Sequence, residues 1–279
     1  MKVSLIVNPF ATRVSEEQVR ALETKLDTVE TLLTERTGHA IELAREAKGE
    51  AVFVYGGDGL VNEALNGLPE GKPLGIVAGG HTNVLARAAG VPSDPARAVH
   101  ERRISLGRVN GRRFGFSAGI GVDSEAVREL ETMRRAGDGK RRGDLAYAQV
   151  VTRRLARGYE PRFEIEGHGR AAMIFVSNDA VFTYAGPRPF RISPDARFEL
   201  GLDFVAPEQA GVASALRYAA RLFAGRGLAG LPGVLHAHDV DTIRVVCDRP
   251  LPLEADGEDL GDVGEAVFEA ERDAVSILV

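Results

Sequence analysis

A glycine-rich turn in the first quarter of the chain has the composition of a phosphate-binding loop. The apolar run Val52–Val54 leads into Tyr55-Gly56-Gly57-Asp58-Gly59, and an amphipathic segment follows. This order predicts a buried strand, a tight turn and the beginning of a helix. Glycine lets the backbone approach a ligand closely and take positive φ, and free N–H groups at a helix start attract phosphate. Because Asp58 would repel phosphate, we expect it to hold a ribose hydroxyl, a backbone N–H or a magnesium ion.

Other short motifs carry groups that could act on a bound phosphate. Asn8-Pro9 and Gly79-Gly80-His81-Thr82-Asn83 each follow an apolar run, and Asp123 and Asp256-Gly257-Glu258 add carboxylates. Phosphoryl transfer needs held phosphates, a magnesium ion, a base near the accepting hydroxyl and exclusion of water. Each motif also has a structural interpretation: Asn-Pro forms turns, and Asp-Gly is typical of a hairpin turn.

Alternating strands and helices must position the glycine-rich turn. Ser15 and Gln18 have the spacing of a capping box, which predicts a helix to about Leu26. Alternation of this kind predicts a doubly wound parallel sheet with helices on both faces. We expect strands at 3–7, 29–33, 52–54 and 74–77, and helices at 38–47, 83–89 and 95–100.

The pattern changes after about Ile104 to short strands, which predicts a second, mainly antiparallel β domain. Asn110-Gly111 lies between strand-like segments and indicates a hairpin. The domains are therefore expected at 1–105 and 106–269. We expect strands at 162–165, 171–176, 198–205 and 240–247, helices at 124–133, 144–157 and 209–224, and a last strand at 275–279.

Composition limits the classes of function. The chain has 279 residues, 44% of them hydrophobic, and a formal net charge of −5, which argues against general nucleic-acid binding. Cys247 is the single cysteine and is expected as a buried strand thiol. We expect a cytoplasmic protein, because no signal peptide or run of about 20 apolar residues is visible.

Together the motifs resemble those of the diacylglycerol kinase catalytic family, which includes bacterial lipid kinases and sphingosine kinases. The resemblance implies an NAD kinase-like nucleotide-binding domain, a β-sandwich-like second domain, and a tail at about 270–279 that returns to the first. It implies ATP and Mg²⁺ as cofactors, Asp256 as the base, and Asp123 linked to magnesium through water. The nucleotide-binding residues would be Asn8, Pro9, Thr34, Gly56, Gly57, Asp58, Gly59, Asn62, Glu63, Gly79, Gly80, His81, Thr82, Asn83 and Glu258.

The chain departs from the family pattern at four places. Leu60 stands where threonine is common, and His81 occupies the threonine position of the Gly-Thr pair, with Thr82 one residue later. The first loop, Asn8 to Ala11, lacks the usual Ser-Gly. A structural metal is not expected, because Leu200 cannot supply an oxygen ligand.

We therefore expect a kinase that phosphorylates a hydroxyl of diacylglycerol or a related lipid. A catalytically weak nucleotide- or lipid-binding protein on the same fold, and an NAD kinase-like enzyme, are the alternatives. The segments 180–182 and 222–224 could line an acyl cleft or belong to the core. A homodimer and peripheral contact with the inner membrane face are further expectations. Membrane contact is suggested by the basic cluster of Arg134, Arg135, Lys140, Arg141, Arg142, Arg153, Arg154 and Arg157.

Overall fold

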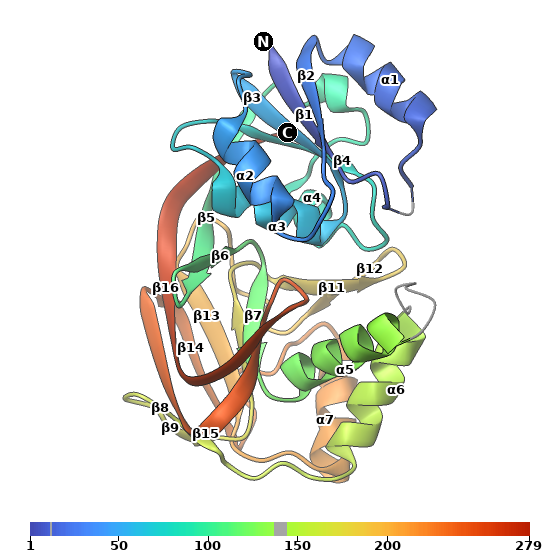
Figure 1. The fold of residues 1–279 in the computed structure, drawn as a ribbon. Helices are drawn as coiled ribbons and strands as arrows, with labels where there is room; N and C mark the ends of the chain where they lie inside the picture. The colour runs from blue at the N-terminus through green and yellow to red at the C-terminus, as the bar shows by residue number, and fades with distance from the viewer. Residues whose placement is uncertain (12, 137–143) are drawn as a thin grey trace. The chain divides into compact units, whose positions relative to one another are not determined.

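The computed structural model describes residues 1–11, 13–136 and 144–279, and its chain divides into two compact units. Unit 1 comprises residues 1–106 and 272–279, and unit 2 comprises residues 107–271. The last residues of the chain therefore belong to the unit that contains the N-terminus. Figure 1 shows the elements of each unit.

Unit 1 is built on a parallel sheet in the order β2 (Thr28–Leu33), β1 (Val3–Val7), β3 (Ala51–Gly56), β4 (Leu74–Ala78). The end of β16 (Glu258–Leu278) pairs with β4 through Ile277 and Leu74. Every residue of β1 and β3 is buried. Such continuous burial is expected for parallel strands that are covered on both faces, as the sequence predicted.

Helices of unit 1 cover both faces of this sheet (Figure 1). α1 (Glu16–Lys25) begins at Ser15, whose hydroxyl accepts the N–H of Gln18, so the predicted N-cap is confirmed. Leu22 of α1 packs on the face formed by Val3, Leu5 and Val7. α2 (His39–Glu46) packs against α3 (Asp58–Gly67) on the other face, and α4 (Val84–Ala89) and the 3₁₀ turn Pro95–Arg97 follow β4.

Unit 2 is mainly antiparallel, as predicted. Its sheet has the order β14 (Val234–Val240), β13 (Leu202–Pro207), β10 (Ile174–Ser177), β7 (Ser117–Ile120), β15 (Thr242–Ala255), β16. Three further hairpins are β5–β6 (Glu101–Val109, Arg112–Phe114), β8–β9 (Phe163–Ile165, Gly169–Ala171) and β11–β12 (Val181–Ala185, Arg188–Arg191). Within unit 2, α5 (Val122–Ala136), α6 (Asp144–Leu155) and α7 (Val212–Phe223) lie together beside the sheet (Figure 1).

Several predicted boundaries in unit 2 are wrong. The segment 171–176 divides into the end of β9 and the beginning of β10, and residues 198–201 form a turn before β13. The segment 240–247 spans a turn at Asp241, and β15 continues far beyond it into a long hairpin with β16. The part of β16 before the predicted last strand at 275–279 was missed because it carries many charged residues, so the apolar alternation is weak.

Two local predictions have clear outcomes. Asn110 and Gly111 both have positive φ and join β5 to β6, so the predicted hairpin is confirmed. Cys247 lies on β15 but is half-buried rather than buried. Burial still raises the pKa of its thiol to about 11, so the thiol stays protonated at neutral pH.

His238 on β14 makes unit 2 sensitive to pH. Its Nδ1 lies 2.9 Å from both carboxylate oxygens of Asp203, and this hydrogen bond raises the pKa of His238 above its usual value. A raised folded-state pKa means that the contact stabilises the fold fully below the unfolded-state pKa of about 6.5. The stabilisation is lost as pH rises through the folded-state pKa.

We therefore expect His238→Gln to lower the free energy of unfolding at about pH 5.5 more than at about pH 8.5. Urea denaturation at the two pH values measures the difference. His236→Gln is the control, because His236 is exposed on the same strand. A loss of equal size at both pH values for His238→Gln would contradict the assignment.

Candidate functional site

Two glycine pairs of unit 1 meet backbone to backbone at the carboxyl ends of β3 and β4. The N–H of Gly79 donates to the carbonyl of Gly56 at 2.8 Å. A Cβ on Gly80 would lie 2.5 Å from the Cα of Gly57, and a Cβ on Gly57 would lie 3.3 Å from the Cα of Gly80. These glycines do not have the positive φ that the sequence led us to expect. Glycine is needed here because two loop backbones touch.

This contact makes Gly80 a position where one methyl group should matter. Gly80→Ala places its Cβ against backbone, which no rotamer change can relieve, so we expect the free energy of unfolding to fall by about 1–3 kcal/mol. Gly264→Ala is the matched control, because its Cβ would meet open space and its φ is not positive. Urea denaturation compares the two variants. If both variants lost the same free energy of unfolding, the two loops would have enough room between them for a methyl group.

Polar side chains fix the two loops. Asp58 is the first residue of α3, and its Oδ1 accepts the N–H of Leu85 in α4 at 3.3 Å. Of the three partners expected for Asp58, the structure therefore shows the backbone N–H. Asn83 has φ of 50° and holds Gly80 by both ends of its amide, at 2.9 and 3.0 Å. These contacts place the first turn of α3 beside the glycine pairs.

The first loop of unit 1 is tied to the same strand end. The N–H of Asn8 donates to the carbonyl of Tyr55 at 3.1 Å, and its side-chain oxygen accepts the N–H of Phe10 at 3.0 Å. Pro9 and His81 are exposed, and Thr82 is partly exposed. Unit 1 therefore brings the Asn-Pro loop and both glycine pairs to one edge of its sheet.

Besides Asn83, three predicted nucleotide-binding residues with polar side chains are buried in unit 1. The carboxylate of Glu63 accepts the N–H of Gly38 at 2.8 Å and of Ala40 at 3.1 Å, so it caps α2. Asn62 is 1% exposed, and its oxygens accept hydrogen bonds from the amide of Asn66. Thr34 is also buried. These contacts support a structural role for Glu63, because its carboxylate stabilises the beginning of a neighbouring helix.

Unit 2 gathers a buried acidic cluster around Asp123. Gly121 precedes α5 with φ of 133°, and a Cβ there would lie 2.4 Å from the Cβ of Met173, so glycine is required before Asp123. The hydroxyl of Tyr147 donates to the carboxylate of Asp123, and Glu254 at the end of β15 is the second carboxyl group. Asp123 is 5% exposed and Glu254 is 1% exposed. Nothing in the sequence singled out Tyr147, because its role depends on how α6 packs against α5.

Burial sets the electrostatics of this cluster. It raises the pKa of Glu254 well above its usual range, and the charges of Asp123 and Asp256 raise it further. Burial also raises the pKa of Asp123, although hydrogen bonds from Tyr147 and Glu254 oppose that rise. Two buried carboxyl groups in contact cannot both ionise at low cost, so one proton or one cation between them is the stable state. Glu254 Oε1 is buried without a hydrogen-bond partner among the described residues, which fits such an occupant.

Asp256 lies in the turn between β15 and β16. Asp256 and Gly257 both have positive φ, and Ala255 pairs with Glu258, so this is the Asp-Gly hairpin turn that the sequence allowed. The carboxylate of Asp256 also reaches the segment before β7. It accepts N–H groups from Gly115 at 2.6 Å, Phe116 at 3.0 Å and Ser117 at 3.2 Å. Asp256 is therefore a buried carboxylate that is oriented by backbone donors.

Neighbouring acids of the same hairpin are also engaged. Glu258 Oε2 accepts a hydrogen bond from Arg112 at 2.8 Å. Glu254 accepts the N–H of Gly257 at 3.0 Å, which places Glu254 beside the Asp-Gly turn. Unit 2 therefore brings both Asp123 and Asp256 close to Glu254. Within the described residues, no group of three or more His, Cys, Asp or Glu side chains is arranged to hold a metal ion by itself.

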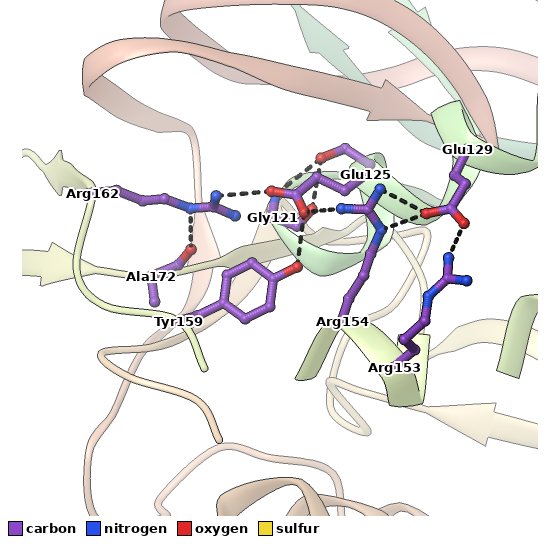
Figure 2. A network of polar contacts seen from close by, with 9 residues as sticks. Gly121, Glu125, Glu129, Arg153, Arg154, Tyr159, Arg162 and Ala172 are labelled. Atoms are coloured by element: carbon purple, nitrogen blue, oxygen red, sulfur yellow. Dashed lines mark hydrogen bonds and ion pairs between the residues drawn. The ribbon is translucent and has the colours of Figure 1, made fainter. Parts of the chain in front are cut away.

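A second network of unit 2 centres on Glu125 of α5 (Figure 2). Its carboxylate accepts Arg154 Nη1 at 2.6 Å, Arg162 Nη1 at 2.8 Å and the hydroxyl of Tyr159 at 2.8 Å. Burial and the hydrogen bond to Glu125 raise the pKa of Tyr159 to about 12, so its hydroxyl stays a donor. The adjacent Glu129 pairs with Arg153 and Arg154.

Two arginines of the expected basic cluster are paired with carboxylates in this network. Arg153 and Arg154 are neutralised by Glu125 and Glu129, because the α5–α6 packing brings opposite charges together. The side chains of the five other residues from Arg134 to Arg142 lie outside the described part of the chain. A hollow of about 430 Å³ borders the network, but its lining contains none of Asp123, Glu254 and Asp256.

Two domain models match the chain. The diacylglycerol kinase catalytic domain matches residues 2–109, and the YegS C-terminal NAD kinase beta sandwich-like domain matches residues 117–279. The chain belongs to the diacylglycerol kinase family. Both the family and the fold class expected from the sequence are thereby confirmed. Membership of a kinase family indicates a phosphotransferase.

Individual relatives agree with this assignment. The diacylglycerol kinase of Bacillus subtilis strain 168 is 27% identical over 250 residues, which cover 79% of this chain and 76% of that protein. A Streptococcus pneumoniae protein named as a candidate lipid kinase is 32% identical over 147 residues, which cover 47% of this chain. That match covers 50% of the Streptococcus protein.

Solved structures share the fold of this family member. The crystal structure of a diacylglycerol kinase from Bacillus anthracis strain Sterne has a TM-score of 0.71 at 24% identity, covering 99% of this chain and 96% of that one. An NAD kinase from Archaeoglobus fulgidus, solved in complex with ATP, has a TM-score of 0.51 at 11% identity, covering 100% of this chain and 94% of that one. None of the helices in the described residues is long and apolar enough to cross a bilayer.

Proposed function

We propose that this protein transfers the γ-phosphate of ATP to a hydroxyl group of diacylglycerol or a related lipid. The observation that supports this best is the backbone contact of the two glycine pairs at the start of α3, in a chain matched by kinase-family models in both units. A helix start offers N–H groups that no carbonyl of the helix accepts, and these suit phosphate oxygens. Glycines without side chains leave that backbone accessible to a nucleotide.

In this proposal unit 1 binds the nucleotide and unit 2 supplies the groups that act on the acceptor. Asp256 would take the proton from the lipid hydroxyl while that oxygen bonds to the γ-phosphorus and the bond to the β-phosphate oxygen breaks, which releases ADP. The N–H groups of residues 115–117 orient the carboxylate for this role. Transfer rates depend on such orientation.

Magnesium fits the donor set of unit 2. Asp123 and Glu254 present carboxylate oxygens, which Mg²⁺ prefers, and Glu254 Oε1 is buried without a hydrogen-bond partner among the described residues. We propose that these two residues hold the ion directly or through water. When bound, Mg²⁺ would neutralise charge on the transferred phosphate.

A nucleotide-binding protein without efficient transfer is the second candidate. The contacts of Asp256 favour it, because three backbone donors already occupy the carboxylate that would serve as the base. Leu60 and His81, which depart from the family pattern, favour it too. In that case Leu60→Thr with His81→Thr should raise activity.

The test uses purified full-length protein, ATP labelled in the γ-phosphate, magnesium, and mixed micelles that contain diacylglycerol or a long-chain base. Labelled phospholipid supports the proposed kinase and names its acceptor class. Label on NAD but not on lipid would point to the NAD kinase-like alternative. ATP binding without labelled product would favour the binding protein.

Nucleotide binding is tested separately by calorimetry on Asp58→Ala. Losing the carboxylate that holds Leu85 of α4 should weaken ATP binding strongly, because the loop beside the start of α3 loses its anchor. Glu70→Ala is the control, since Glu70 is an exposed acid of the same unit. Unchanged ATP affinity in Asp58→Ala would remove Asp58 from the proposed nucleotide site.

A further inference from the structure

Helix α7 exposes an apolar stripe. The side chains of Val212, Leu216 and Phe223 are 59%, 69% and 75% exposed. Residues four and eleven positions apart on an α-helix point within about 40° of each other, so these three share one side of α7. Tyr218 and Leu222 face the core of unit 2 instead. Phe223, which the sequence suggested as cleft lining or core, therefore lies on the surface.

The stripe continues onto the β11–β12 hairpin. The ring of Phe190 in β12 packs edge-on against Phe223, with 5.5 Å between ring centroids. By contrast, Val181 is buried and Phe182 packs on Phe175, so the other segment suggested for a cleft belongs to the core. We call the exposed side of α7 and the adjoining part of β12 the α7–β12 surface.

The two segments that form this surface carry only positive charges. Residues 180–194 and 209–233 contain no aspartate or glutamate, although the whole chain has 40 acidic residues and 35 Lys and Arg. The same two segments carry Arg188, Arg191, Arg217, Arg221 and Arg226.

These arginines keep their charge. Arg217 and Arg221 donate to the backbone carbonyls of Pro232 and Gly227, which leaves each guanidinium positive. In the part of the chain that the structure describes, no carboxylate forms an ion pair with any of the five. This differs from the α5–α6 arginines, whose charges are met by Glu125 and Glu129.

We propose that the α7–β12 surface docks on an anionic lipid bilayer. An amphipathic helix with an apolar face and arginines beside it lies in the plane of the membrane interface. Its apolar side chains enter the acyl boundary while the arginines meet the headgroup phosphates. This inference rests on the proposed function in one respect: docking would bring the protein to its lipid acceptor.

Charge decides between a bilayer and a second copy of this chain. A two-fold dimer through this surface would bring its uncompensated arginines close to those of the partner, and like charges repel. A neutral protein partner would leave these positive charges without counterions. An anionic bilayer would bury the apolar stripe and pair the arginines with headgroup phosphates.

Vesicle sedimentation tests the proposal without any need for catalysis. The full-length protein is mixed with vesicles of phosphatidylcholine alone, or with about 30% phosphatidylglycerol. We expect binding to the anionic vesicles that weakens strongly at about 1 M salt, where the screening length falls to about 3 Å.

Arg188→Gln with Arg191→Gln and Arg226→Gln should weaken binding about 100-fold, since each charge contributes roughly a factor of five. Leu216→Ser with Phe223→Ser should weaken it at least about tenfold.

Controls on other surfaces of unit 2 keep the comparison matched. Arg170→Gln with Arg244→Gln removes charge from arginines that are ion-paired, and Val246→Ser removes an exposed apolar side chain from β15. Both controls should bind like the unmodified protein. Equal loss in controls and surface variants, or no vesicle binding by the unmodified protein, would overturn the proposal. So would a dimer in sedimentation equilibrium that Phe223→Ser dissociates.

An activity comparison separates this inference from the proposed function. With acceptor lipid in anionic vesicles, the triple arginine variant should lose transfer, while with a short-chain acceptor in solution it should match the unmodified protein. If the unmodified protein bound vesicles but transferred phosphate to neither acceptor, the kinase proposal would be overturned and the docking proposal would stand. If the triple arginine variant and the unmodified protein transferred phosphate equally to vesicle lipid, the docking proposal would be overturned and the kinase proposal would stand.

Discussion

Replacing Asp256 with asparagine should lower the rate of phosphoryl transfer at least about 100-fold. A positioned general base typically contributes a factor of 10² to 10⁴, and an amide cannot accept the proton of the lipid hydroxyl. Nucleotide affinity should change little, because ATP binding is assigned to unit 1. Single-turnover transfer of labelled γ-phosphate and calorimetric titration with ATP measure the two quantities.

The same substitution should also destabilise unit 2. The carboxylate of Asp256 accepts three backbone N–H groups, and an amide offers only one oxygen to them. Its NH₂ group would then face an N–H donor, which leaves a buried donor unpaired and costs about 1–3 kcal/mol. Loss of activity alone therefore does not identify a base, and unfolding must be measured on the same sample.

Two comparisons separate the two effects of Asp256. Asp262→Asn, at an exposed acid of the same hairpin that pairs with Arg128, should leave transfer unchanged and alter the free energy of unfolding by no more than about 1 kcal/mol. Transfer by Asp256→Asn should stay low at about 10 °C and low denaturant, where the variant is still folded. If folded Asp256→Asn transferred phosphate at the unmodified rate, the carboxylate would be a structural tie between the β15–β16 turn and β7.

Replacing Glu125 with glutamine should produce the largest loss of stability, about 3–5 kcal/mol. Glu125, Arg154 and Arg162 have side chains that are 15%, 22% and 18% exposed. Glutamine keeps the size of the side chain but removes the charge that balances Arg162, while Arg154 keeps its pair with Glu129. An uncompensated buried charge is costly, whereas an exposed ion pair contributes little.

Chemical denaturation followed by a probe in unit 2 measures this loss. Glu16→Gln is the matched control, because the Glu16–Arg20 pair is 92% and 77% exposed. We expect the control to change the free energy of unfolding by no more than about 0.5 kcal/mol. A loss as small in Glu125→Gln would mean that water, not Glu125, balances the charges of Arg154 and Arg162.

Local patterns determined much of the fold before any contact was known. The Ser15 cap, the buried runs of β1 and β3 and the Asn110-Gly111 turn depend on residues adjacent in sequence, which act alike in most tertiary settings. The β15–β16 hairpin depends on pairing over long stretches with weak alternation, so its extent could not be predicted. The motifs that indicated a kinase are likewise local, because glycine turns and Asp-Gly pairs keep their spacing in the chain.

What each motif residue contacts was decided only by tertiary structure. The sequence by itself determined that Gly56-Gly57 and Gly79-Gly80 follow strands and that Asp123 and Asp256 are carboxylates near tight turns. Packing decided that the glycine pairs touch each other, that Glu63 caps α2, and that Glu254 and Tyr147 join Asp123. The reason is physical: burial and hydrogen bonding between residues as far as 141 positions apart set the charge and orientation of a side chain. Neighbours in sequence carry no information about such contacts.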